Sequence, residues 1–288
     1  MGRIRATLLA AAAVGLVWGG VALGARVSIF DQERVLRAKG PTLWDASVAI
    51  NANGCQGSTS DPVYTPVYDG QSAAGNRFRD DAFDNGMVIL VDGTEYYDAD
   101  GIVTAKGESV TTDARNTASL SIRRTDTALS SGPILRSLVR MKAVGSAFNG
   151  TVTLDSNLGS DGFEDTRATA SGDESFTTAD RWFVSSEPPP LETGEDPAVT
   201  EVLYGKGASR KASTIVSGPG TGCVTVDFDL SLAPGKTRYL LFFAEINPSP
   251  GRAATSARKY NRRRLSRALR KGLGKKVKRR IVNWDLSP

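Results

Sequence analysis

The feature that most constrains the fold is the two-residue spacing of apolar side chains, which recurs between residues 43 and 246. In residues 222–230, apolar side chains stand at every second position from Val224 to Leu230, with Thr and Asp between them. This alternation is typical of a strand with one buried face. Many short strands, separated by turn residues and without helical patterns between them, favour a sandwich over βαβ units. We therefore predict a mainly β fold, built as a large antiparallel β-sandwich.

The strand-like runs can be assigned individually. They occupy residues 43–51, 87–91, 94–97, 119–124, 134–143, 151–154, 181–185, 199–204, 222–230 and 237–246. The strongest hairpin signal is Asp92-Gly93, because these two residues accept the positive φ angles of a type I′ turn. The run at 237–246 is apolar on both faces, so we expect it in the centre of a sheet. Three consecutive prolines in residues 185–197 predict a long surface loop there.

The apolar spacing changes after residue 251. From there it is four residues, in the series Leu265, Leu269, Leu273, Val277 and Ile281. Residues 252–281 also carry 14 Lys and Arg and no Asp or Glu. A four-residue apolar period with charges between is typical of an amphipathic helix. We therefore predict a basic C-terminal helix over residues 253–271, a break at Gly272 and Gly274, and a second helix over residues 275–283.

The charge of the chain is divided between two regions. Residues 26–251 carry 20 Lys and Arg against 30 Asp and Glu, so the formal +5 of the whole chain combines an acidic body with a basic tail. The tail can dock on the body through its apolar stripe, or it can bind an anionic envelope polymer, a glycan or a membrane surface. Nucleic acid is a less suitable partner for an exported protein. The binding candidates are Arg262, Arg263, Arg264, Lys275, Lys276, Arg279 and Arg280.

The N-terminus predicts export. Arg3 and Arg5 precede an uncharged, Ala- and Gly-rich stretch that ends in small residues, which is the pattern of a cleaved secretory signal. The alternative is an uncleaved membrane anchor. We expect a signal peptide at residues 1–25, a β-sandwich domain at residues 26–251 and a basic helical segment at residues 252–288, in a secreted protein.

Two residue counts limit the chemistry. The chain has two cysteines, Cys55 and Cys223, and an even pair in an exported chain favours a disulfide, with two buried free thiols as the alternative. The chain has no histidine. This excludes Ser/His/Asp and Cys/His nucleophile systems and histidine metal sites.

Carboxylates are the remaining candidates for chemistry. Asp80, Asp81 and Asp84 form the densest acidic cluster, and paired carboxylates can cleave glycosidic bonds when they face each other across a cleft. The same spacing is that of a turn leading into a strand, so we assign no catalytic role to them.

Calcium is a second possibility for the acidic residues. Asp155, Asn157 and Asp161 offer oxygen ligands of the kind that Ca²⁺ takes, but they do not fit the EF-hand pattern. Side-chain turns that stabilise loops are the favoured explanation, so we assign no metal site to these residues. We expect no other cofactor.

Several motifs resemble a family of secreted bacterial β-sandwich proteins to which no activity is assigned. They lie at residues 151–162, 171–173, 179–182, 196–197, 202–205 and 283–286, and so cover most of the chain that follows the signal. The resemblance implies a large sandwich similar to the supersandwich of galactose-mutarotase-like and polysaccharide-lyase domains. It supplies no catalytic residues, and the mutarotases of that fold act through histidine, which this chain lacks.

These observations favour a non-catalytic protein, secreted or associated with the cell envelope, in which the basic tail has a binding or structural role. The alternative is a carbohydrate-active enzyme of glycosidase or lyase type that uses carboxylates with a tyrosine. The sequence leaves the ligand and the oligomeric state open.

Overall fold

The computed structural model describes residues 24–28, 34–40, 42–49, 53–54, 57–58, 63–65, 70–74, 77–79, 82–95, 102–117, 119–159, 165–186, 197–217 and 222–286. The predicted signal peptide lies outside these residues except for its last two, and so do Cys55, Asp80, Asp81 and Asp161. The side chain of Asp84 is outside the description as well. Among the described residues, no helix is long and apolar enough to cross a membrane.

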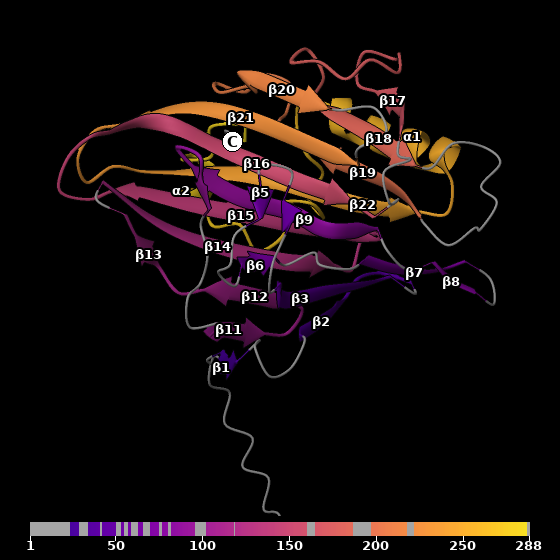
Figure 1. The fold of residues 1–288 in the computed structure, drawn as a ribbon, viewed down its shortest axis with the longest axis horizontal. Helices are drawn as coiled ribbons and strands as arrows, with labels where there is room; N and C mark the ends of the chain where they lie inside the picture. The colour runs from indigo at the N-terminus through magenta and orange to yellow at the C-terminus, as the bar shows by residue number, and fades with distance from the viewer. Residues whose placement is uncertain are drawn as a thin grey trace, which may run out of the picture.

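A ten-stranded antiparallel sheet is the largest element of the fold (Figure 1). Its strands, in spatial order, are β1 (Ala25–Ser28), β11 (Ile102–Lys106), β12 (Ser109–Thr112), β14 (Leu120–Leu129), β15 (Ile134–Ala143), β22 (Thr237–Asn247), β19 (Ala198–Val202), β18 (Trp182–Ser186) and β17 (Asp165–Thr169), with β13 (Arg115–Asn116) paired to β14. The strand predicted to be central, β22, lies in the interior of the sheet between β15 and β19.

A second sheet faces the first. It contains, in spatial order, β10 (Thr94–Glu95), β9 (Phe83–Val91), β16 (Phe148–Leu158), β21 (Cys223–Leu232) and β20 (Thr214–Ser217). Figure 1 shows β9, β16 and β21 lying across β14, β15 and β22. The predicted hairpin joins β9 to β10, with Asp92 at φ 50° and Gly93 at φ 74° as a type I′ turn requires.

The N-terminal part of the chain adds small sheets. One contains β2 (Arg34–Arg37), β3 (Leu43–Ala49), β7 (Gly70–Ala74) and β8 (Arg77–Arg79), with β6 (Val63–Thr65) paired to β3, and β4 (Asn53–Gly54) pairs with β5 (Gly57–Ser58). Leu36 and Trp44 from this part are fully buried in the main core. The fold is therefore mainly β with large antiparallel sheets, as the alternation of apolar residues predicts.

The main core lies between the two large sheets. It includes Ile122, Val139 and Phe242 from the ten-stranded sheet and Leu154 and Phe228 from the second sheet. Along each of these strands, the apolar core residues occur at alternate positions. Because side chains of a strand alternate between its two faces, this spacing places them on the face that points into the core. The rings of Phe228 and Phe242 meet across the core with centroids 5.5 Å apart.

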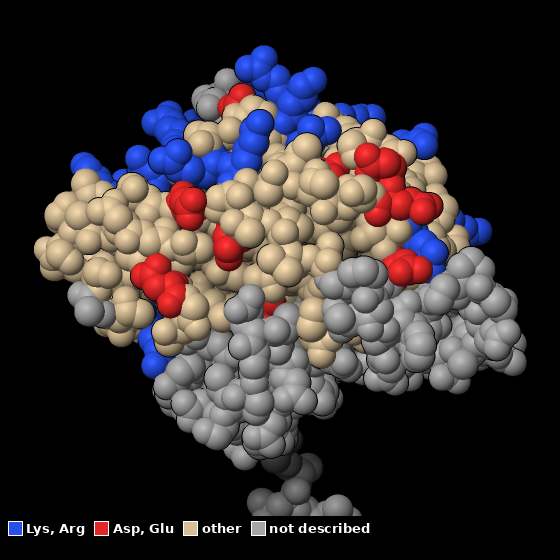
Figure 2. Space-filling view, turned by 45° about the horizontal axis from the view of Figure 1, so that its top comes forward, with Lys and Arg blue, Asp and Glu red and all other residues tan. Residues whose placement is uncertain are grey.

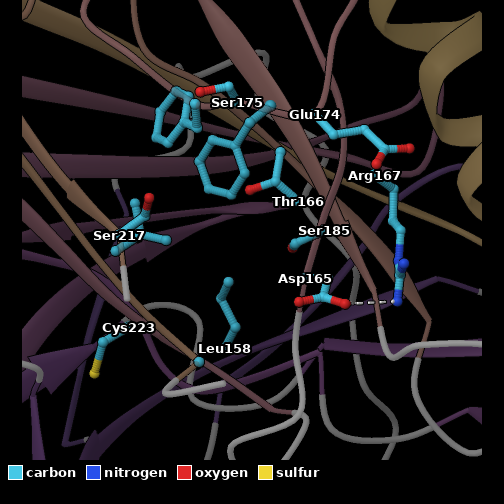
Figure 3. Close-up of a pocket in the computed structure, with 13 residues that line it drawn as sticks. Leu158, Asp165, Thr166, Arg167, Glu174, Ser175, Ser185, Ser217 and Cys223 are labelled. Atoms are coloured by element: carbon cyan, nitrogen blue, oxygen red, sulfur yellow. Dashed lines mark ion pairs between the residues drawn. The ribbon is translucent and has the colours of Figure 1, made fainter. Parts of the chain in front are cut away.

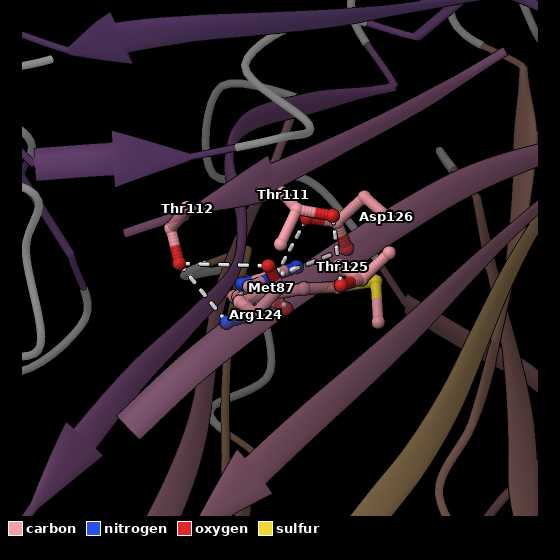
Figure 4. Close-up of polar contacts among 7 residues, drawn as sticks. Met87, Thr111, Thr112, Arg124, Thr125 and Asp126 are labelled. Carbon is pink, nitrogen blue, oxygen red and sulfur yellow. Dashed lines mark hydrogen bonds and ion pairs between the residues drawn. The ribbon is translucent and has the colours of Figure 1, made fainter. Parts of the chain in front are cut away.

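A charged group is buried within this core (Figure 4). Arg124 and Asp126, neighbours on the same face of β14, form an ion pair of 3.0 Å and are about 1% exposed or less. Arg124 also donates to the carbonyl oxygen of Met87 on β9. Met87 has a φ of 58°, unusual for a non-glycine residue, and its N–H donates to Ser156 Oγ at 2.9 Å. These bonds join the two sheets through polar atoms, where apolar packing alone is expected.

Glu201 on β19 is part of the same buried group. Ser156 donates to its Oε1 at 2.6 Å, while its Oε2 has no hydrogen-bond partner among the described residues. Burial raises the pKa of Glu201 to about 7, and the hydrogen bond from Ser156 opposes that rise. The nearby Asp155 raises the pKa further and Arg124 lowers it. Glu201 therefore holds a proton in mildly acidic solution.

The prediction of long C-terminal helices is wrong. The segment begins with α1 (Pro250–Ala257) and the 3₁₀ turn η1 (Arg258–Asn261), Arg262 is extended at ψ 143°, and turns follow until the single helical turn α2 (Lys275–Lys278). Bases occur four residues apart at 258 and 262, at 259 and 263, and at 263 and 267. Like charges at this spacing destabilise a helix, and residues 252–281 contain no acid to compensate them.

Candidate functional site

The C-terminal segment forms a layer on the outer face of the ten-stranded sheet, the face that points away from the second sheet. Four residues of the predicted stripe are buried there, namely Leu265, Leu269, Leu273 and Ile281, and Val277 is partly buried beside them. They pack with outward-facing side chains of the sheet that include Leu241 and Phe243. Of the alternatives for the tail, docking on the body through its apolar stripe is therefore observed, although the chain that carries the stripe is mostly irregular.

Two aromatic residues anchor the ends of the layer. Tyr260 follows α1 and Trp284 lies near the end of the described chain, and both contact Phe243 of β22, with ring centroids 5.4 and 5.7 Å away. Trp284 donates from Nε1 to the carbonyl of Leu241 at 2.7 Å. A Cβ added to Gly205 would come within 2.1 Å of the Trp284 ring, so only glycine leaves room for this packing.

Asn283 fastens the last part of the segment to the sheet. Its Oδ1 accepts from the N–H of Leu241 at 2.9 Å, and its Nδ2 donates to the carbonyls of Leu203 and Leu241 at 2.7 and 2.9 Å. Beside it, Tyr239 and Ile281 form a parallel β-bridge. The amide of one side chain thus satisfies backbone groups that no regular partner strand covers.

Arg136 satisfies backbone groups in the middle of the segment, as Asn283 does near its end. It lies on the outer face of β15, 6% exposed, and its guanidinium donates to the carbonyls of Leu269 and Lys271 at 3.2 and 2.7 Å. Burial lowers the pKa of Arg136 to about 10, so it is cationic at neutral pH. An irregular chain leaves carbonyls unpaired, and a buried cation with several N–H donors satisfies them.

The carboxylate of Glu245 on β22 accepts hydrogen bonds from three side chains at the start of the segment. This buried carboxylate accepts from Lys259 Nζ at 2.6 Å and from Tyr260 Oη at 3.3 Å, and Ser256 donates to it as well. The pKa of the Tyr260 hydroxyl is well above its usual value, chiefly because of burial and then because of the Glu245 charge. One base of the tail, Lys259, thereby neutralises the buried carboxylate of Glu245.

Most of the other bases of the tail face solvent. Ten of the 14 are exposed, and we call them the basic face: Arg252, Arg258, Arg262, Arg263, Arg264, Arg267, Lys271, Lys275, Lys276 and Arg279. Six of the seven binding candidates belong to the basic face, and the seventh, Arg280, is half-buried. Figure 2 shows Lys and Arg gathered along the top of the molecule, while most of the visible Asp and Glu lie below them in small groups. Arg263 forms a long ion pair of 3.6 Å with Asp285.

A groove of about 680 Å³ lies beside the basic face, between residues 268–273 and the outer surface of β12, β14 and β15. Arg37, Lys106 and Lys271 line it, and the one carboxylate among its lining residues, Glu108, accepts from the backbone N–H of Arg37 at 2.5 Å. Hydroxyl groups line the floor and one end, from Ser109, Thr125, Thr127, Ser130 and Ser131. Cationic and hydroxyl side chains are thus brought together along one side of the sheet.

Among the residues that it describes, the structure brings no other candidates together. Asp80 and Asp81 lie outside the described residues, so the structure does not describe how the side chains of the acidic cluster are arranged. Asp155 is buried and accepts from Thr225 Oγ1 at 2.8 Å. No group of three or more Cys, Asp or Glu within the described part of the chain is placed to hold a metal ion. Calcium at Asp155, Asn157 and Asp161 is only the weaker alternative, and it is not tested because Asp161 lies outside the described residues.

Cys223, at the start of β21, is disulfide-bonded, and the described residues contain no free cysteine. Its predicted partner, Cys55, lies outside the described residues. The pairing of these two residues stays a prediction.

Sequence reasoning missed Asn283, Arg136 and Glu245 as anchors of the layer. Asn283 and Arg136 act on backbone groups far away in sequence, and a single polar residue carries no periodic signal of such a role. The clearest available hint was Glu245, an acid within a strand that is otherwise apolar on both faces.

The likeness of this chain to known proteins is structural. No protein family and no curated protein matches the sequence. Among solved structures, the chain is similar to a galactose mutarotase-like protein from Lactobacillus casei, with 12% identity, a TM-score of 0.42, and coverage of 75% of this chain and 100% of the other. It is also similar to a protein described as a kojibiose phosphorylase from the human microbiome, with 10% identity and a TM-score of 0.44. That likeness covers 78% of this chain but only 31% of the phosphorylase.

Proposed function

We propose that this protein is a non-catalytic, envelope-associated binding protein whose basic face holds a linear anionic polymer. The observation that carries the proposal is that ten bases of the tail are exposed while its apolar stripe is buried. Apolar packing holds the segment in place, so most of its charge is not needed for docking. Exposed bases on a fixed support attract a polyanion along their whole length.

The groove supports a polymer that carries hydroxyl groups as well as negative charges. Its cations can pair with phosphate or carboxylate groups, and its Ser and Thr side chains can donate to and accept from sugar hydroxyls. An anionic glycan or a polyol phosphate has both kinds of group. The enzyme alternative has no comparable support, because Asp80, Asp81 and the side chain of Asp84 lie outside the described part of the chain.

Export and a Cys55–Cys223 disulfide belong to the same proposal, since an envelope polymer is met outside the cytoplasm. Cys223 is already disulfide-bonded, and the sequence contains one other cysteine. Thiol titration of the denatured, unreduced protein is expected to find no free thiol. Two free thiols would show that the pairing is wrong.

Polymer binding can be measured by titration calorimetry with two probes, polygalacturonate for carboxylates and a long-chain polyphosphate for phosphates, with neutral dextran as the reference. We expect binding to at least one of the two anionic probes, weakening as salt is added, and none to dextran. Preference between the two probes identifies the anionic group. Binding to anionic lipid vesicles but to neither polymer would overturn the polymer assignment.

Charge variants test which surface binds. We expect the triple change Arg262→Gln, Arg263→Gln, Arg264→Gln to weaken binding about tenfold or more. The matched control is Arg123→Gln, Lys236→Gln, Arg238→Gln, which removes three exposed bases outside the tail. Equal losses in the two triple variants would mean that net charge, and not the basic face, attracts the polymer.

A further inference from the structure

A second cavity lies between the end strands of the two large sheets (Figure 3). Its volume is about 420 Å³. Residues of β17 and β18 form one wall, and β20 and the start of β21 form the other. We call it the end pocket. A volume of this size is within the range that binds small molecules.

Apolar groups cover one side of the end pocket. Phe183 of β18 and Val224 of β21 belong to the main core and reach its inner end, together with Leu158 of β16. Phe176 closes this side, with its ring centroid 4.3 Å from that of Phe183 and 9% of the residue exposed. A ligand in the pocket therefore meets an aromatic and aliphatic surface on one side.

Polar groups cover the rest. Ser185 of β18 is 2% exposed, lines the pocket, and its hydroxyl has no hydrogen-bond partner among the described residues. A buried hydroxyl without a partner costs free energy that a ligand can recover. Thr166, Ser175 and Ser217 bring three more hydroxyls to the same space. The pocket thus offers donors and acceptors suited to a ligand with several hydroxyl groups.

The charges in the pocket are unbalanced. Asp165 and Arg167 of β17 form an ion pair of 3.3 Å, drawn in Figure 3, so they largely neutralise each other. Glu174 also lines the pocket, and it has no ion pair or hydrogen bond among the described residues. Asp173 precedes it, and hydrogen bonds, first that from Thr169, lower the pKa of Asp173 and keep it ionised. The pocket therefore attracts positive charge.

We propose that the end pocket binds a small polyhydroxylated amine, of the size of one amino-sugar unit with a free ammonium group. The ammonium pairs with Glu174, ring hydroxyls bond to Ser185 and its neighbours, and the C–H face of the ring packs on Phe176. This site is distinct from the basic face, which selects the opposite charge. The proposal for the end pocket does not depend on whether the basic face binds a polymer.

Ligand-observed NMR and titration calorimetry on the full chain test the proposal with four probes. We expect saturable binding of glucosamine, and binding about tenfold weaker or undetectable for glucose and N-acetylglucosamine, which lack the positive charge. Cyclohexylamine, which has the charge without the hydroxyls, should also bind weakly. Absence of glucosamine binding overturns the proposal, and so does equal binding of glucosamine with glucose or with cyclohexylamine.

Two variants locate the site. Glu174 is exposed, so Glu174→Gln should leave the fold unchanged and reduce the affinity for glucosamine to that for glucose. Ser185→Ala should weaken binding about fivefold or more, with circular dichroism to check the fold. Asp229→Asn removes an exposed carboxylate from the far end of β21 and should leave affinity unchanged. If Asp229→Asn lowers affinity as much as Glu174→Gln, the end pocket is not the site.

Discussion

The two faces of the ten-stranded sheet are buried in different ways. The inner face packs against a second sheet, so regular strands supply both sides and every second residue points into the core. The outer face packs against a chain that is mostly irregular, in which α1 is the only α-helix of more than one turn among the described residues. Both interfaces bury large aromatic and aliphatic side chains. A segment therefore needs no regular secondary structure to cover a sheet, provided that its backbone groups are satisfied.

The buried polar atoms have different roles in the two interfaces. On the outer face, Asn283, Trp284 and Arg136 bond to backbone groups, so they replace the hydrogen bonds that a helix or strand would make for itself. On the inner face the strands satisfy most of their own backbone groups, with Met87 as an exception that bonds to Arg124 and Ser156, and the buried Glu201 has a strongly raised pKa. The outer face should consequently be sensitive to loss of single anchors, and the inner face to pH.

The largest effect is expected for Trp284→Ala. The change removes a buried ring that packs on Phe243 and a hydrogen bond to Leu241, and we expect a loss of about 3–5 kcal/mol in the free energy of unfolding, measured in urea. Val216→Ala is the control, since Val216 is 58% exposed and should change stability little. A loss below about 1 kcal/mol for Trp284→Ala would contradict the view that single anchors hold the outer layer.

The pH dependence of stability tests the inner face. Glu201 has a usual pKa of 4.5 and a pKa of about 7 in the folded protein, so the folded protein binds its proton more tightly than the unfolded chain. Its contribution to stability is complete below pH 4.5 and is lost as pH rises through 7. Between pH 5 and 8 the native chain should lose roughly 2 to 3 kcal/mol through this group, and Glu201→Gln should not. If the free energy of unfolding changes with pH in the same way in the native protein and in Glu201→Gln, Glu201 is not the source of the pH dependence.

The smallest effect is expected for Arg263→Ala. The Arg263 side chain is 76% exposed and its ion pair with Asp285 is long, so water and salt screen it. Stability should stay within about 0.5 kcal/mol of the native value in the same urea titration. A loss above about 1 kcal/mol would show that charge, as well as apolar contact, holds the outer layer.

Sequence patterns predicted the fold where the signal was local. The runs at 134–143 and 237–246 correspond closely to β15 and β22, and the turn at Asp92-Gly93 is correct, because alternation and turn chemistry act over a few residues. Strands β11, β12, β17 and β20 were not predicted, since they are short and rich in Thr, Ser and Ala. The four-residue spacing after Leu265 correctly predicted which side chains are buried and wrongly predicted a helix.

The candidate sites were predictable only in part. Exposure of most of the basic candidates followed from the apolar stripe, because the residues between its members must face outward. The groove and the end pocket each combine residues from several strands far apart in sequence. A single sequence contains no measure of those distances, so neither cavity had a signal.

The position of Asn283 and Trp284 in the chain also affects how the protein is made. During synthesis, every strand of both large sheets is complete before these residues emerge, so Leu241 and Phe243 on the outer face lack part of their cover until Asn283 and Trp284 are added. A nascent or shortened chain presents this apolar surface to chaperones, proteases and other copies of itself. Asn283 and Trp284 cover part of that surface once they are made, which should lower the tendency of the chain to aggregate.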